Sequence, residues 1–284
     1  MLLLMMLALP LLATLIAATS EVSAPFVNAN AIEASATTPI VEPATTFDHS
    51  HGALTRVLSK YVKKDRVAYR ALKEERAALD DYIASLEGLT APEFAAWSRE
   101  QKYAFWINVY NAYTLKVVID HYPVKSIRDI KEGSTGVWDL GIVDLAELAS
   151  GLGQSRLSLN DVEHKILREE FKDARVHAAV NCASVGCPPL AARAFTAEGL
   201  DEMLTQQVRT WLADSARNRV VREKNCLEIS KIFEWFASDF ERDAGGVRQW
   251  IAKYAPADVG EWLEAQEKVK IQYLDYSWDL NETK

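Results

Sequence analysis

Two cysteines, a serine and a histidine lie close together in the second half of the chain and could carry out covalent chemistry. Cys182 and Cys187 lie in a turn-like run of small residues and prolines, with Ser184 between them and His177 upstream. A thiol nucleophile needs a lowered pKa and a base within hydrogen-bond reach. We expect Cys182 to attack, with Cys187 as the rival nucleophile. Ser184 and Asn181 are expected to support the site, and the backbone N–H groups of the turn are expected to form an oxyanion hole.

His164 and His177 are the candidate general bases. We favour His164, because residues 175–182 form a predicted strand on which His177 would face away from Cys182. Glu163 or Asn181 would orient the base or stabilise charge. Glu163 precedes His164, but neighbouring side chains on a helix point about 100° apart. Glu163 can therefore pair instead with His177 or with Arg168, further along the same helix.

The sequence also allows the two cysteines to form a disulfide or to take part in redox chemistry. A Cys182–Cys187 disulfide can span a turn, and an exported protein permits one. The same pair could serve thiol–disulfide exchange, although the spacing is not Cys-x2-Cys. Pro188 could begin a helix, whose dipole would favour a thiolate at Cys187. The spacing His177-x4-Cys182-x4-Cys187 does not match a structural zinc site, so we expect no metal and no cofactor.

A long apolar helix is predicted to carry two asparagines that could support the site. Ser98 with Gln101 has the pattern of a capping box, and it predicts a helix that runs to about His121. Asn108 and Asn111 share one face of this helix, and buried amides need partners. We expect them to hold a loop, the loop of the cysteines included, rather than to bind substrate. Lys231 lies near a helix start, where it is expected to have a specific acidic partner.

Composition and charge exclude several classes of protein. The 284 residues carry a net charge of −8, which argues against a nucleic-acid partner and against polybasic docking to a membrane. Residues 1–24 resemble a signal peptide or N-terminal anchor, which predicts a periplasmic or secreted protein whose only membrane contact would be this segment. Residues 25–48 are predicted to be a disordered linker, with His49 and His51 solvated at its end. Residues 49–284 are predicted to form a single globular domain.

Helix signals outnumber strand signals in this domain. Predicted strands are short: residues 175–182, a hairpin of 219–222 with 227–230, and 270–274. Ser158 with Asp161 predicts the start of the helix that carries Glu163 and His164. We therefore expect an α+β fold, with a small antiparallel-containing sheet wrapped by several helices.

Five sequence blocks together resemble the domain of unknown function 547 family. In chain order these blocks are Ala104–Asn111, Asp161–Arg168, Val176–Leu190, Ser230–Phe240 and Tyr273–Asn281. The resemblance covers roughly residues 50–281. It implies a common site, because the family's blocks contain the polar residues chosen above on chemical grounds. It names no reaction.

The leading hypothesis is an exported cysteine-dependent hydrolase or acyltransferase with a Cys-His-Glu type site. It would act on an amide, peptide or thioester bond of a small-molecule or peptide substrate. A papain-like or transglutaminase-like arrangement is an analogy that rests on the residue types alone. The alternatives are a thiol–disulfide redox protein and a non-catalytic binding module.

Overall fold

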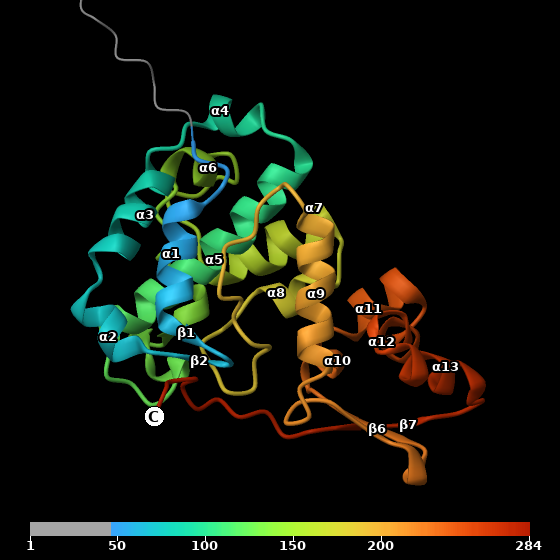
Figure 1. Cartoon of the computed structure of the whole chain (residues 1–284). Coiled ribbons are helices and arrows are strands. Elements are labelled where there is room, and N and C mark those ends of the chain that lie inside the picture. Colours follow the sequence, from blue (N-terminus) through green and yellow to red (C-terminus); the bar gives the residue numbers. More distant parts are fainter. Residues whose placement is uncertain (1–46) are drawn as a thin grey trace, which may run out of the picture. The chain divides into compact units, whose positions relative to one another are not determined.

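The computed structural model describes residues 47–284 (Figure 1). These residues belong to one compact unit. The predicted signal peptide, residues 1–24, and residues 25–46 of the predicted linker lie outside the described residues. The elements of the described part confirm the α+β prediction, since helices dominate and the sheets have only two or three strands.

Most helices and strands follow one another along the chain with short connections, but residues 180–199 between α8 and α9 form a long loop that carries Cys182 and Cys187. The α-helices are α1 (Gly52–Tyr61), α2 (Tyr69–Glu74), α3 (Ala77–Glu87), α4 (Ala91–Ala95), α5 (Arg99–His121), α6 (Ala146–Ser150), α7 (Glu169–Phe171), α8 (Val176–Ala179), α9 (Leu200–Leu212), α10 (Ile232–Trp235), α11 (Ala237–Ala244), α12 (Val247–Tyr254) and α13 (Ala257–Ala265). Three short 3-10 helices are η1 (Ile127–Asp129), η2 (Val137–Asp139) and η4 (Arg222–Lys224), and η3 (Asp161–Arg168) is a π-helix. The strands are β1 (Val62–Lys63), β2 (Arg66–Val67), β3 (Lys131–Glu132), β4 (Thr135–Gly136), β5 (Arg219–Val221), β6 (Cys226–Ile229) and β7 (Lys270–Tyr273).

Helix α5 is the central element of the first hydrophobic core. Its N-terminus has the predicted capping box, in which Ser98 accepts from the Gln101 N–H and the Gln101 side chain accepts from the Ser98 N–H. Most of the helix is buried, and it packs against α2, α3 and η3. Among the described residues, no helix has both the length and the apolar composition that a membrane span requires. An apolar helix of this kind is a core helix, and it gives the side chains on it fixed positions.

The second hydrophobic core lies between a three-stranded sheet and helices α9 to α13. Strands β5 and β6 form the predicted antiparallel hairpin, and β7 adds in parallel to β6. Trp211 on α9 stacks on Phe233 of α10 at 4.5 Å between ring centroids. Figure 1 shows this part in orange and red, with α9 between it and the helices of the first core.

The last eleven residues, 274–284, which we call the C-terminal strap, run from β7 back to the first core (Figure 1). The strap pairs with the cysteine loop through backbone hydrogen bonds from Val185 to Asp279 and from Gly186 to Ser277, both 2.8 Å. Its end pairs with β2, where the Thr283 N–H donates to Val67. The strap therefore holds the cysteine loop against the first core.

The predicted solvent exposure of His49 and His51 is wrong. His51 is 2% exposed, and its Nδ1 lies 2.8 Å from the Tyr82 hydroxyl. The His49 ring packs edge-on against Trp97 at 4.4 Å. Both histidines follow Phe47, whose ring contacts Trp97 and Phe105. The aromatic residues bring the chain into the core at this point, which a linker-like composition upstream does not reveal.

Candidate functional site

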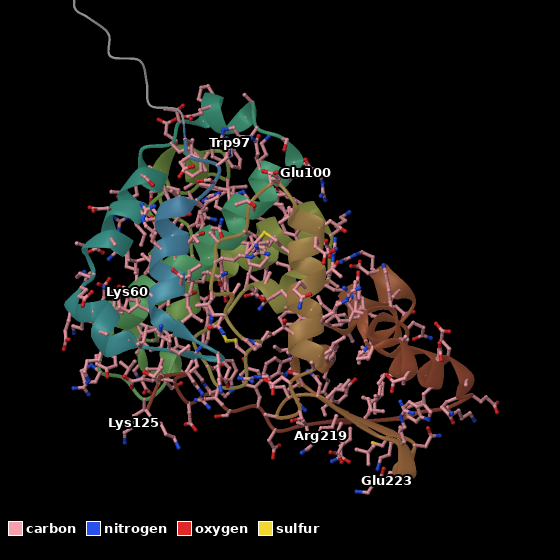
Figure 2. The ribbon with its side chains drawn as sticks, in the orientation of Figure 1. Lys60, Trp97, Glu100, Lys125, Arg219 and Glu223 are labelled. Atoms are coloured by element: carbon pink, nitrogen blue, oxygen red, sulfur yellow. A yellow bond between two sulfur atoms is a disulfide. The ribbon has the colours of Figure 1, made fainter. Side chains whose placement is uncertain are left out.

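Cys182 and Cys187 form a disulfide, which is the alternative that the sequence left open (Figure 2, yellow). The Tyr276 hydroxyl of the strap lies 3.2 Å from each sulfur. Ser184 Oγ lies 3.2 Å from the Cys182 sulfur and 2.8 Å from the Tyr276 hydroxyl. Cys187 is 4% exposed, whereas Cys182 is intermediate. Cys182 is therefore the more accessible of the two.

The cysteine loop is held from α5, as the asparagine pattern predicts. Asn111 donates to the Ala179 carbonyl and accepts from the Asn181 N–H, both at 2.9 Å. Asn108 makes the same pair of bonds to both backbone groups of Phe195. Neither amide lines the cavity described below. Their role is to fix the backbone of two loops that have no regular structure of their own.

Asn181 also supports the loop from within. Its side chain accepts from the Ala183 N–H at 2.9 Å and donates to the Pro188 carbonyl at 2.8 Å. Asn281 of the strap donates to the same Asn181 oxygen at 3.2 Å. Ala183 has a positive φ of 58°, a backbone conformation that residues other than glycine disfavour. The hydrogen bonds of the Asn181 side chain stabilise the turn in this conformation.

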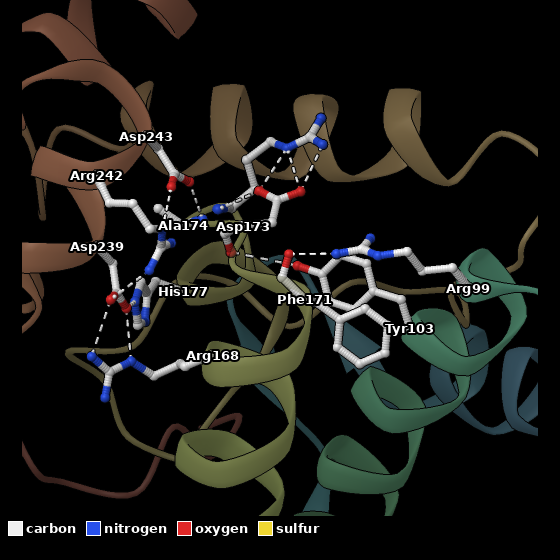
Figure 3. Close-up of polar contacts among 11 residues, drawn as sticks. Arg99, Tyr103, Arg168, Phe171, Asp173, Ala174, His177, Asp239, Arg242 and Asp243 are labelled. Atoms are coloured by element: carbon white, nitrogen blue, oxygen red, sulfur yellow. Dashed lines mark hydrogen bonds and ion pairs between the residues drawn. The ribbon is translucent and has the colours of Figure 1, made fainter. Parts of the chain in front are cut away.

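His177 is paired with a buried carboxylate (Figure 3). Its Nε2 lies 2.8 Å from Oδ2 of Asp239 on α11. Arg168 binds the same carboxylate through two bonds of 2.7 and 3.2 Å, and Arg242 adds a third contact at 3.1 Å. Burial raises the pKa of Asp239, but the hydrogen bonds from His177 and Arg168 outweigh it and hold that pKa well below its ordinary value. Asp239 is therefore an anion that orients the imidazole.

Segment 171–177, which leads into α8, is held on two sides (Figure 3). The Ala174 N–H donates to Asp243 of α11 at 2.5 Å, and Arg99 of α5 donates to the Phe171 carbonyl at 2.6 Å. The Phe236 ring stacks on His177 at 4.1 Å. These contacts leave the imidazole little freedom to rotate.

His164 has an arginine partner rather than a carboxylate. Arg168, one turn along η3, lies with Nη1 3.0 Å from Nδ1 of His164. Because a guanidinium only donates, Nδ1 must accept, so the neutral imidazole carries its proton on Nε2. In this tautomer His164 offers a donor to its surroundings, whereas His177 donates to Asp239 and keeps Nδ1 as its acceptor.

One cavity of about 190 Å³ brings most of the predicted site residues together. Its walls include Glu163, His164, His177, Cys182 and Cys187. The remaining wall is mainly aromatic and comes from α5, η2, the α10–α11 junction and the strap: Tyr110, Trp138, Trp235, Phe236, Tyr276 and Trp278. No hydrogen bond joins either imidazole to a sulfur among residues 47–284. The cavity is where these groups can meet a common ligand.

Three local predictions about this region are wrong. Residues 176–179 form helix α8, not a strand, and the chain becomes extended at Val180, directly after it. His177 is therefore not confined to one strand face. No helix begins at Pro188. The turn offers few free N–H groups for an oxyanion hole, because those of residues 182, 183, 185, 186 and 187 already have acceptors.

Two other predicted residues have structural partners. Ser184 is fully buried, and its backbone pairs with Leu280 of the strap. Lys231 has its acidic partner in Glu234, at 2.5 Å on the same helical turn, and does not line the cavity. Within residues 47–284 no three histidine, cysteine, aspartate or glutamate side chains group as metal ligands.

Asp239 and Tyr276 are the site residues that sequence reasoning missed. Both occur in blocks that carry the family resemblance, Asp239 next to Phe240 and Tyr276 near the C-terminus. That position in the blocks is the only signal that could have found them, since they lie 62 and 94 residues from the groups that they contact, His177 and Cys182.

Comparison with known protein families finds a match in the middle of the chain. Residues 94–212 match the family model described as "Protein of unknown function, DUF547". The chain contains a DUF547 domain. The matched segment includes Asn111, His164, His177 and both cysteines of the disulfide, whereas Asp239 and Tyr276 lie beyond it. No curated protein and no solved structure matches the chain.

Proposed function

We propose that this DUF547 protein is a cysteine-dependent hydrolase or acyltransferase acting on an amide or thioester bond. One observation carries the proposal: the more exposed sulfur, Cys182, lines the same cavity as His177, and a buried carboxylate orients His177. A thiol, an imidazole and an orienting carboxylate are the groups that thiol acyl-transfer chemistry uses. The carboxylate in this arrangement is Asp239, where the sequence favoured Glu163.

The disulfide makes reduction the first step. An external dithiol supplies two electrons, the Cys182–Cys187 bond breaks, and two thiols form while the dithiol becomes a disulfide. The Nδ1 atom of His177 then accepts the proton of the Cys182 thiol. Cys187 is the buried partner that closes the disulfide again on oxidation.

Acyl transfer follows from the thiolate. The Cys182 sulfur attacks the substrate carbonyl carbon and a C–S bond forms. The bond to the amine or thiol leaving group breaks as that group takes the proton from His177. Water, deprotonated by the same imidazole, then hydrolyses the acyl-cysteine, or an acceptor amine or alcohol replaces water in a transferase.

Two donors in the cavity wall are suited to the oxygen of the tetrahedral intermediate. They are the Nε2–H of His164, whose tautomer Arg168 sets, and the Tyr276 hydroxyl, which donates to Cys187 Sγ in the disulfide and must turn from it to reach the oxygen. Burial raises the pKa of Tyr276, so the hydroxyl keeps its proton at neutral pH. These side chains take the place of the backbone donors, which are already bonded within the turn.

Thiol reactivity tests the proposal. The protein is reduced with dithiothreitol, treated with iodoacetamide at pH 7 and analysed by mass spectrometry. We expect Cys182 to react at least tenfold faster than Cys187 and buried Cys226, and His177→Ala to remove this advantage. Lys231→Ala is the control, because Lys231 lies outside the cavity. If no cysteine reacts selectively, or if His177→Ala leaves the rate of Cys182 unchanged, the proposal fails.

A thiol–disulfide redox protein is the second candidate, and the disulfide itself favours it. Its partner would be a dithiol or a thiol substrate that enters the cavity at Cys182. The reduction potential separates the cases. A value above about −300 mV supports a reducible pair, and a value well below it marks a structural disulfide and contradicts both candidates.

We also propose export to the periplasm or secretion. The disulfide supports an oxidising location. Fractionation of cells that express the full chain tests this, and a protein confined to the cytosol would refute it.

A further inference from the structure

The cavity has aromatic rings on several sides, and these rings contact one another. Trp278 of the strap lies 5.5 Å from Trp138 of η2 and 5.9 Å from Trp235 of α10, measured between ring centroids. Tyr276 lies 4.6 Å from Trp278 and 4.8 Å from Trp235. Trp235 is 45% exposed. Trp235 therefore forms a contiguous, partly exposed aromatic patch with Tyr276 and Trp278, and a patch of this kind beside a cavity is a candidate binding surface.

Glu163 is the acidic group in this aromatic wall. It is 9% exposed, and no ion pair among residues 47–284 includes it. The basic residues on the same helical segment have other partners: Lys165 pairs with Asp161, and Arg168 pairs with Asp239. Burial raises the pKa of the Tyr110 and Tyr276 hydroxyls, and the nearby charge of Glu163 raises both further. Tyr110 is also a hydrogen-bond partner of Glu163. A buried carboxylate without a cation is costly unless a ligand supplies one.

Aromatic faces and a carboxylate attract the same kind of group. The face of an indole or phenol ring carries negative electrostatic potential and binds cations. The outer surface of the wall already does so, since Arg128 lies 5.3 Å from the Trp278 ring centre and Arg168 lies 4.7 Å from that of Phe236. A neutral apolar ligand would fill the cavity but would leave the Glu163 carboxylate without a cation.

The polar groups available in the cavity wall indicate which kind of ammonium group fits it. A primary ammonium has three N–H donors and needs an acceptor for each. Besides Glu163, the polar side chains in the wall are Asn160, two tyrosines and two histidines, each of the histidines with one ring nitrogen already bonded. Asn160 donates to Asp139 and the Tyr276 hydroxyl donates to Cys187, so most of the wall surface that faces a ligand comes from aromatic rings. A methylated ammonium has few or no N–H donors and loses less hydration on burial, so it suits a wall made of rings and one carboxylate.

We propose that this cavity binds a methylated ammonium group, held by Glu163 and by the rings of Trp138, Trp235, Tyr276 and Trp278. As a statement about substrate it rests on the proposed function: the ammonium group would lie beside the acyl bond that Cys182 attacks. As a statement about binding it needs no thiol chemistry, and it applies equally to a binding module.

Calorimetry with matched probes tests the proposal. The probes are choline, ethanolamine, and the tert-butyl analogue of choline, in which carbon replaces the quaternary nitrogen. The full chain is used with its disulfide intact. We expect choline to bind at least tenfold more tightly than the uncharged analogue and than ethanolamine. Equal binding of choline and the uncharged analogue, tighter binding of ethanolamine, or no binding of choline up to tens of millimolar would overturn the proposal.

Two variants identify the groups responsible. Glu163→Gln keeps the size of the side chain and removes its charge, so we expect choline binding to weaken about tenfold while the uncharged analogue is unaffected. Glu234→Gln is the matched control, because Glu234 pairs with Lys231 outside the cavity. Trp278→Leu tests the rings independently and should also weaken choline binding. If both cavity variants bind choline as the unaltered protein does, the proposed site is wrong.

The thiol assay keeps the two proposals apart. Preference for choline without a selectively reactive cysteine would refute the enzyme and leave the ammonium site standing. A reactive Cys182 without preference for choline would refute only the ammonium site.

Discussion

The Nε2 atom of His177 lies 2.8 Å from the Oδ2 atom of Asp239, although the two residues are 62 positions apart in the chain. Helix α8 contributes the imidazole and α11 contributes the carboxylate. Arg168 binds the same carboxylate from η3. This contact therefore joins three segments, and its strength bears on both the stability of the domain and the orientation of His177.

Asp239→Asn tests that contact. The change leaves Arg168 and His177 without their anion, and removing one partner of a buried pair costs about 3 kcal/mol of unfolding free energy. Because the pKa of Asp239 is depressed in the folded protein, its contribution is present above the ordinary value of 3.8 and is lost as the pH falls below it. Urea unfolding at pH 7 and pH 3 measures both effects.

The control for Asp239 is Asp258→Asn, which removes an exposed partner of Arg222. We expect a change within about 0.5 kcal/mol. If Asp239→Asn is as mild as Asp258→Asn at pH 7, the buried network does not stabilise the fold.

His51 predicts a second pH effect. Burial lowers its pKa to about 4 from 6.5. The unfolded chain therefore binds a proton between these values while the folded protein does not, and stability falls as the pH drops from 6.5 to 4. The loss attributable to His51 is about 3 kcal/mol.

His51→Asn removes this titration and keeps a residue that tolerates the positive φ of 46° at this position. Unfolding free energies at pH 7 and pH 4 should therefore differ less in the variant than in the unaltered protein. His49, whose pKa burial also lowers, contributes in the same direction to both. An identical pH dependence in the two proteins would show that His51 titrates normally.

Asn111 and Asn108 provide a matched pair of substitutions. Each amide satisfies one carbonyl and one N–H of a loop, so alanine at either position should cost about 2–4 kcal/mol of unfolding free energy. Only Asn111→Ala disturbs the backbone that leads into Cys182. We therefore expect Asn111→Ala, and not Asn108→Ala, to change the reduction potential of the disulfide. Equal reduction potentials in the two variants would show that the contact from α5 does not affect the disulfide.

Gly186→Ala tests the close approach of the strap to the cysteine loop. A Cβ atom at this position would lie 2.8 Å from atoms of the Tyr276 ring, so the ring must move away from the two sulfurs. Overpacking of this kind costs about 1–3 kcal/mol, and the rate of disulfide reduction by dithiothreitol should change. Gly88→Ala is the control, because its Cβ would meet only the Ala84 carbonyl at 3.9 Å. Equal melting temperatures and reduction rates for the two variants would contradict this account.

The elements that local rules govern were predictable. The capping box of Ser98 and Gln101, the hairpin around residues 223–225 and the last strand at 270–273 appear as expected, since each depends on residues a few positions apart. The strand predicted at 175–182 failed because a short apolar run has the same pattern in a buried strand and in a buried helical turn.

The sequence also identified residues of the candidate site. The side chains that it selected line one cavity: Cys182, Cys187, His164, His177 and Glu163. Which of them pair was decided by tertiary structure. Arg168 determines the tautomer of His164, Asp239 is the carboxylate that pairs with His177, and Tyr276 reaches both sulfurs from the strap. Periodicity and capping report contacts within one or two turns, whereas these partners meet only because two hydrophobic cores and the strap bring distant segments to the same cavity.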